Sequence, residues 1–169
     1  MSDSIHERVW PRPDAGAWQA SIEFLSFVVV TAINKVEGLT DEQARVTPLP
    51  TSPAMSPLGL LKHLTAVLRQ HVQLHIGGSD LPSLWRSDDL DFEFRLAGDE
   101  TAARIIATLA DELHRSTQTL AGIDPEQMIV AHGKPVRAAR LLVDVVQECA
   151  RHLGHIDILR EMIDGSRGE

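Results

Sequence analysis

Residues 148–161 read ECARHLGHIDILRE, and this stretch decides the fold because it has the pattern of a long amphipathic helix. Around it, apolar residues recur three or four positions apart, which is the spacing of a helix face that packs on a core. The residues on that face are Leu142, Val145, Cys149, Leu153 and Ile156. We expect the helix to run from about residue 136 to 164, with Gly165 as a left-handed C-terminal cap.

Three earlier stretches have the same helical periodicity, over residues 14–38, 57–77 and 99–122. Two long connections separate them, residues 39–55 and 79–98. The second connection contains the alternating run LDFEFRL, but no partner strand is evident, so we expect an extended crossover segment. The sequence therefore predicts an all-α fold, a four-helix bundle with two long crossover loops.

Capping residues support these boundaries. Ser56 can cap the free backbone N–H groups at the start of the second helix, and Pro57 suits its first position. Asp99 is the expected cap of the third helix, and Gly122 is expected to end it.

Composition and charge limit the function. A chain of 169 residues can bury one sizeable core, so we expect a single domain over residues 1–169 with an extended N-terminal arm over residues 1–13. The formal net charge of −8 argues against binding to nucleic acid or to an anionic membrane surface. The only cysteine, Cys149, excludes an intrachain disulfide and fits a reducing compartment.

The N-terminal region indicates neither secretion nor membrane insertion. It lacks the apolar run that a signal peptide needs. The most apolar early stretch, residues 24–33, is too short to span a bilayer. We therefore expect a cytoplasmic protein.

A polar stripe runs beside the apolar face of the last helix. Glu148, His152 and His155 lie within a narrow sector, because each helical residue turns by about 100°. Asp144 lies near the edge of that sector. A buried carboxylate costs several kcal/mol unless it is paired, so a sheltered stripe would indicate a bound cation. On an exposed face, the same spacing of Glu148 and His152 would give only a solvated pair.

His63 occupies a matching position at the boundary of the core face of the second helix. If the second and fourth helices are neighbours, His63 can face Glu148 and His152. Two imidazoles and one carboxylate with an open position form an arrangement suited to Zn²⁺ or a similar divalent ion. The pattern therefore has two interpretations, a metal site between these two helices or a solvated Glu–His pair.

The remaining histidines and the cysteine have ordinary explanations. His71 and His75 could line the same cleft, but packing at the edge of the core explains them more simply. Cys149 fits a buried, inert thiol. Surface or loop positions are expected for His6, His114 and His132.

Three segments of the chain resemble the DinB-like superfamily, in a branch catalogued as a domain of unknown function. They are RHLGHIDILREMIDG in the last helix, GLLKHLTAV in the second and GDETAARIIATLADEL at the start of the third. The last of the four helices carries the most specific segment, and the likeness covers about residues 15–165. The resemblance implies a DinB/YfiT-like four-helix bundle with a metal site formed by the second and fourth helices.

The resemblance also implies roles for individual residues. The implied metal ligands are His63, Glu148 and His152, and His155 is assigned to ligand contact or to support of the ligands. A glutamate at position 148 resembles the mycothiol-dependent maleylpyruvate isomerase type. His71 and Asp144 depart from residues frequent in relatives, so the substrate does not follow from the likeness.

Related members use mycothiol, bacillithiol or glutathione. The resemblance therefore implies a metal-dependent enzyme that transfers a low-molecular-weight thiol such as mycothiol to a small electrophilic molecule, or isomerises that molecule with the help of the thiol. Zinc is the expected metal, with nickel or iron as alternatives. The expected partners are the small-molecule substrate and the thiol, and a homodimer is expected from the likeness.

Two other functions would use the same scaffold. A metal-dependent hydrolase would need the same ligands but no thiol. A non-enzymatic binding or stress protein would use the bundle alone, with the polar stripe as a structural feature.

Overall fold

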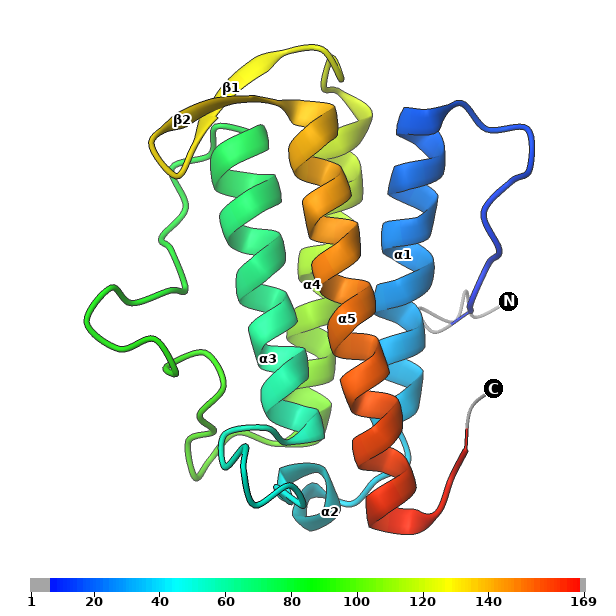
Figure 1. Cartoon of the computed structure of the whole chain (residues 1–169), viewed down its shortest axis with the longest axis vertical. Helices are drawn as coiled ribbons and strands as arrows, with labels where there is room; N and C mark the ends of the chain where they lie inside the picture. The colour runs from blue at the N-terminus through cyan, green and yellow to red at the C-terminus, as the bar shows by residue number, and fades with distance from the viewer. Residues whose placement is uncertain (1–6, 168–169) are drawn as a thin grey trace.

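The computed structural model describes residues 7–167 and consists mainly of helices, with one short β-hairpin (Figure 1). The prediction of an all-α bundle is confirmed. The elements are α1 (Ala17–Val36), α2 (Asp41–Arg45), α3 (Pro57–Val67), η1 (Leu68–Ile76), α4 (Ala102–Ala121), β1 (Met128–Ala131), β2 (Lys134–Arg137) and α5 (Ala138–Asp164).

Four long helical segments, α1, α3 with η1, α4 and α5, lie side by side (Figure 1). Helix α1 packs on α5, and α3 with η1 packs on α4 and α5. The segment between η1 and α4 returns along the length of the bundle, so α3 and α4 point in the same direction (Figure 1). The connection between α1 and α3 stays at one end and contains α2, so only one of the two predicted crossover loops is a crossover.

Aliphatic side chains from every long helix form the core. Helix α1 is long and apolar enough to cross a membrane by length and composition alone. In the bundle, however, it packs on α5 with Leu25, Val29 and Ile33 fully buried. Burial of these side chains in the core accounts for the apolar composition of this helix.

Three of the predicted helix boundaries are confirmed by the capping geometry. The Ser56 hydroxyl accepts a hydrogen bond from the N–H of Gly59 at 3.0 Å, and Pro57 is the first residue of α3. Helix α4 ends at Ala121 with Gly122 as its C-cap, and Gly165 has a φ of 78°, the left-handed conformation expected of a C-terminal cap.

The predicted cap of the third helix is wrong. Asp99 is exposed, and the cap is Thr101, whose hydroxyl accepts from the N–H of Arg104 at 3.3 Å. Helix α4 therefore begins two residues later than expected. The intervening Glu100 does not join the helix because its carboxylate bonds Lys62 and the N–H of Ala97.

The start of the fourth helix was also predicted too early. Val136 belongs to β2, where it pairs with Ile129 of β1. The two strands are joined by His132 and Gly133, with φ values of 52° and 72°. Positive φ at both central residues is the requirement of a type I′ hairpin turn, and glycine meets it without strain.

The connections differ from the predictions in three further ways. The loop over residues 39–55 contains α2, which starts with a capping box formed by Thr40 and Gln43. The crossover is not extended around Phe92 and Phe94, because the chain forms turns there. The backbone N–H groups of these residues donate to the carbonyl oxygens of Asp89 and Asp91. Residues 68–76 form a π-helix instead of continuing as α-helix.

The N-terminal arm was predicted over residues 1–13, and its first six residues lie outside the described part of the chain. The following residues contain no helix or strand. Arg12 bonds the carboxylate of Glu23 through its backbone N–H at 2.8 Å and its Nε at 2.9 Å. This part of the arm therefore lies against α1.

Candidate metal centre

Three predicted ligands from two helices converge in the bundle. His63 of α3 faces Glu148 of α5, with 3.6 Å between Nε2 and Oε1. His152, one turn after Glu148, has its Nε2 3.0 Å from the same oxygen. One ligand atom of each residue lies within 4.8 Å of the other two. Tetrahedral ligands with metal bonds of 2.0–2.1 Å lie roughly 3.4 Å apart, so these separations suit a divalent cation.

His63 is held by the crossover segment as well as by its own helix. The ring of Phe94 stacks on the His63 ring, with 4.3 Å between centroids and 13° between planes. Glu93 places its Oε1 3.5 Å from Nδ1 of His63. The two ring nitrogens of His63 therefore face two different carboxylates, Glu93 on one side and Glu148 on the other.

The backbone of the crossover approaches α3 closely enough to position Glu93. A Cβ on Gly59 would lie 2.6 Å from the carbonyl oxygen of Phe94, so only glycine fits there. Nζ of Lys62 donates to the carbonyl oxygen of Arg95 at 2.7 Å and bonds Glu100 at 3.0 Å. These contacts fix the residues that follow Glu93 against the first half of α3.

The histidines of the cluster are neutral near pH 7. Burial, together with the neighbouring His152, lowers the pKa of His63 to about 4. Burial also lowers the pKa of His152. Burial acts to raise the pKa of Glu148, but the hydrogen bond with His152 and the other interactions with His152, His63 and Arg151 together leave that pKa below its ordinary value. Two neutral imidazoles beside an ionised carboxylate leave net negative charge at the site.

Unpartnered nitrogens indicate that the cluster suits a cation. Both ring nitrogens of His63 are buried and have no hydrogen-bond partner among the described residues. Leaving such a group unsatisfied costs about 1–3 kcal/mol. A cation at the meeting point of His63, Glu148 and His152 would accept the lone pairs and offset the carboxylate charge. The donor set therefore fits a divalent transition metal.

His155 lies beside the cluster and does not join it. Its Nδ1 is 3.3 Å from Nδ1 of His152. If His152 donates its Nδ1 proton to His155, then Nε2 of His152 carries a bare lone pair toward Glu148. Both histidines line a pocket of about 340 Å³, together with Met55 and Phe94. His155 is thus placed both to fix the tautomer of His152 and to meet a molecule in the pocket.

Other predicted residues lie away from this cluster. Asp144 is exposed and pairs with Arg140. Cys149 is fully buried, and burial raises the pKa of its thiol to about 12. His114 is exposed and contacts Gln118, as expected of a surface residue. His6 lies outside the described residues.

Glu93 is the site residue that the sequence did not predict. It lies in the alternating run LDFEFRL, which gave no sign of a contact with His63. Burial raises the pKa of Glu93. Its place beside a ligand follows from the path of the crossover, and helical periodicity carries no information about that path.

Comparison with known proteins identifies the family. The sequence model of the mycothiol-S-transferase family matches residues 21–165. The chain belongs to the mycothiol-S-transferase family. This family is DinB-like, so the resemblance read from the sequence is confirmed.

The fold of this mycothiol-S-transferase family member also occurs in a solved structure. The crystal structure of a conserved protein from Enterococcus faecalis matches with a TM-score of 0.58 and 18% sequence identity. The match covers 88% of this chain and 97% of the other. At that identity the likeness shows the fold alone. No curated protein matches the chain in sequence.

Proposed function

We propose that the chain is a metal-dependent enzyme that joins a low-molecular-weight thiol of the mycothiol type to a small electrophile, or uses the thiol to isomerise it. The observation that carries this proposal is the convergence of His63, Glu148 and His152 around one point, with unpartnered nitrogens on His63. Membership of the mycothiol-S-transferase family supports the choice of thiol.

His63, Glu148 and His152 would hold the cation, with zinc as the first choice and nickel or iron as alternatives. When bound, a divalent cation supplies Lewis acidity that lowers the pKa of a nearby thiol toward neutral pH. The protein ligands occupy three positions, which leaves space for another group.

The surrounding residues would orient the ligands and control the proton. Glu93 faces Nδ1 of His63 and favours the tautomer that turns a bare Nε2 toward Glu148. His155 holds the matching tautomer of His152 through the contact between their Nδ1 atoms. At the edge of the pocket, His155 can also take up the thiol proton. Phe94 covers one face of His63 and shields it from water.

The sulfur nucleophile would come from a separate molecule. Cys149 is the only cysteine of the chain, and it is fully buried with a thiol that stays protonated. The pocket beside His152 and His155 offers about 340 Å³, enough for part of a small electrophile or thiol.

The test is a thiol-transfer assay on purified protein loaded with Zn²⁺, with mycothiol and a chromogenic aryl halide as probes. We expect turnover that needs both metal and thiol, and a loss of at least about 100-fold in Glu148→Gln and His152→Ala. His114→Asn, which changes an exposed histidine, is the control and should keep full activity.

Each alternative function has its own result in the same experiment. Hydrolysis of esters or amides without any thiol, lost in the same two variants, would indicate a metal-dependent hydrolase. A protein that binds no stoichiometric metal, and whose Glu148→Gln variant behaves like the wild type, would indicate a non-enzymatic binding protein. A cytoplasmic location and a homodimer stay predictions.

A further inference from the structure

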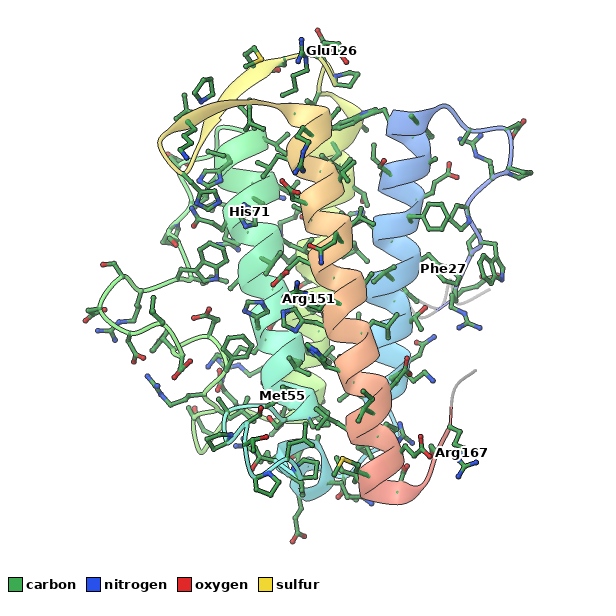
Figure 2. All side chains as sticks on the ribbon, viewed as in Figure 1. Phe27, Met55, His71, Glu126, Arg151 and Arg167 are labelled. Atoms are coloured by element: carbon green, nitrogen blue, oxygen red, sulfur yellow. The ribbon has the colours of Figure 1, made fainter. Side chains whose placement is uncertain are left out.

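A second histidine cluster lies at the hairpin end of the bundle. His71 and His75 come from η1, and His132 comes from the turn between β1 and β2. Their ring centroids are 5.5 Å apart for His71 and His75, 5.3 Å for His71 and His132, and 5.2 Å for His75 and His132. One ring nitrogen of each residue lies within 4.8 Å of the other two. Figure 2 labels His71 just below the hairpin.

Two separate features of the fold bring these three rings together. In η1, His71 and His75 are four residues apart, close to one turn, so both rings project from one side. Strand β1 packs on η1 with Ile129 and Ala131 buried, which brings the turn over the helix. His132 then adopts a φ of 52°, a conformation uncommon for residues other than glycine.

Two nitrogens of the cluster are buried and unsatisfied. Nδ1 of His71 and Nδ1 of His75 have no hydrogen-bond partner within residues 7–167. Nε2 of His75 already contacts the side-chain amide of Gln70 at 3.1 Å, so Nδ1 is its free nitrogen. A buried nitrogen without a hydrogen-bond partner is destabilising, and the ring contacts of His71 with Trp85 and His132 do not supply one.

The electrostatics favour a cation over protons in this cluster. Burial, together with His75 and His132, lowers the pKa of His71 to about 4. Burial and His132 lower the pKa of His75 as well. With their pKa lowered, His71 and His75 stay neutral near pH 7 and keep their lone pairs. The carboxylates of Asp144 and Glu148 lie close enough to affect His71, and they favour positive charge there.

We propose that His71, His75 and His132 form a second metal site, which binds a first-row divalent transition metal such as Zn²⁺, Ni²⁺ or Co²⁺ through three imidazole nitrogens. The site shares no ligand with the centre at His63, Glu148 and His152. A metal bound there would tie the hairpin to η1. His71 and His63 lie eight residues apart, roughly 12 Å along a helix, so the two sites are separate.

The test is metal stoichiometry on the full chain after removal of all metal with a chelator. Zn²⁺ is added, excess is removed by gel filtration, and bound zinc is measured by elemental analysis. We expect two equivalents in the wild type and one in His75→Gln and in His132→Asn. Asparagine tolerates the left-handed conformation at the turn, and glutamine is a good helix former, so both variants should fold.

Matched variants separate this site from the first one. His114→Asn should keep two equivalents of zinc. The double variant Glu148→Gln/His152→Ala should keep one equivalent, and adding His132→Asn to that double variant should remove it. One result would overturn the second site and leave the first intact. In that result the wild type binds a single equivalent, which is lost in the double variant and kept in both His75→Gln and His132→Asn. Two equivalents in every variant would overturn it too.

Trp85 provides a second readout because its ring lies 5.2 Å from that of His71. Co²⁺ added to metal-free wild type should quench the fluorescence of Trp85, and the loss should vanish in Trp85→Phe. His132→Asn, checked for folding by circular dichroism, should abolish the quenching without changing the spectrum of the metal-free protein. Quenching that is equal in wild type and His132→Asn would contradict a cobalt ion bound at His132.

Discussion

The carboxylate of Glu93 faces Nδ1 of His63, the ring nitrogen opposite the one that faces Glu148. A carboxylate behind a histidine ligand holds the ring in one tautomer and makes its other nitrogen a better ligand. Glu93 is partly sheltered, and burial raises its pKa, so its interaction with His63 is poorly screened by water.

We expect Glu93→Gln to weaken zinc binding at the first site by about 10- to 100-fold, because an amide supports the His63 tautomer less well than a carboxylate. Competition with a chromogenic chelator measures the affinity. The assay is best done in the His132→Asn background, where only the first site is expected to bind. Glu126→Gln, which changes an exposed carboxylate, serves as the control. Equal affinities in both variants would remove Glu93 from the site.

The sequence predicts the helical part of the first site but not its loop residue. His63, Glu148 and His152 lie on helices with clear apolar periodicity, and the family resemblance implied that those two helices are neighbours. Glu93 and His132 lie in connections, where the contact depends on how the chain returns to the bundle. The only local sign of the hairpin in the sequence is Gly133 after the apolar run MIVA, because glycine suits a turn that needs positive φ.

At the scale of the elements, η1 is fixed to α4 by one buried ion pair. Arg69 donates from Nε and Nη2 to the two carboxylate oxygens of Glu112, at 2.9 and 2.7 Å. The side chains are only 12% and 2% exposed. A two-pronged pair of this kind sets both the distance and the rotation between two helices.

We expect Glu112→Ala to lower the free energy of unfolding by about 3–5 kcal/mol, because it leaves the Arg69 charge buried without its counter-charge. Urea denaturation measures the change. Glu126→Ala is the matched control, since its pair with Arg137 is exposed and should contribute less than about 1 kcal/mol. A similar small loss in both variants would mean that the buried pair does not hold η1 to α4.

The long helices were predictable because apolar spacing persists over several turns in each. The ends of the helices were harder to predict. Asp99 and Thr101 are both good caps, and only the tertiary contacts of Glu100 decide between them. The change from α-helix to π-helix at Leu68 could not be predicted, because it alters hydrogen bonding while leaving the apolar pattern almost unchanged.

At the scale of the whole molecule, the bundle encloses imidazoles that must remain neutral. The pKa of His63 and that of His71 are both lowered to about 4 by burial, from an ordinary value of 6.5. Below pH 6.5 the unfolded chain takes up protons on these residues and the folded chain does not. Stability is therefore lost as the pH falls from 6.5 to about 4, and neither residue contributes a pH dependence above that window.

We expect the free energy of unfolding of metal-free protein to fall between pH 7 and 4, with about 2–3 kcal/mol of the loss due to His71. Urea denaturation across that range, in the presence of a chelator, measures the slope. His71→Gln should show a correspondingly shallower slope. An identical slope in wild type and variant would mean that His71 takes up its proton as readily in the folded chain as in the unfolded chain.

The burial of Cys149 has a consequence for the durability of the protein. An enzyme that handles electrophiles is exposed to alkylation at any reactive sulfur of its own. On the proposed function, the sole thiol, enclosed in the core with a pKa of about 12, would not compete with the small thiol for the reagent. Toxic reagent would therefore be consumed by a cofactor that the cell can replace, and the catalyst would survive many encounters undamaged.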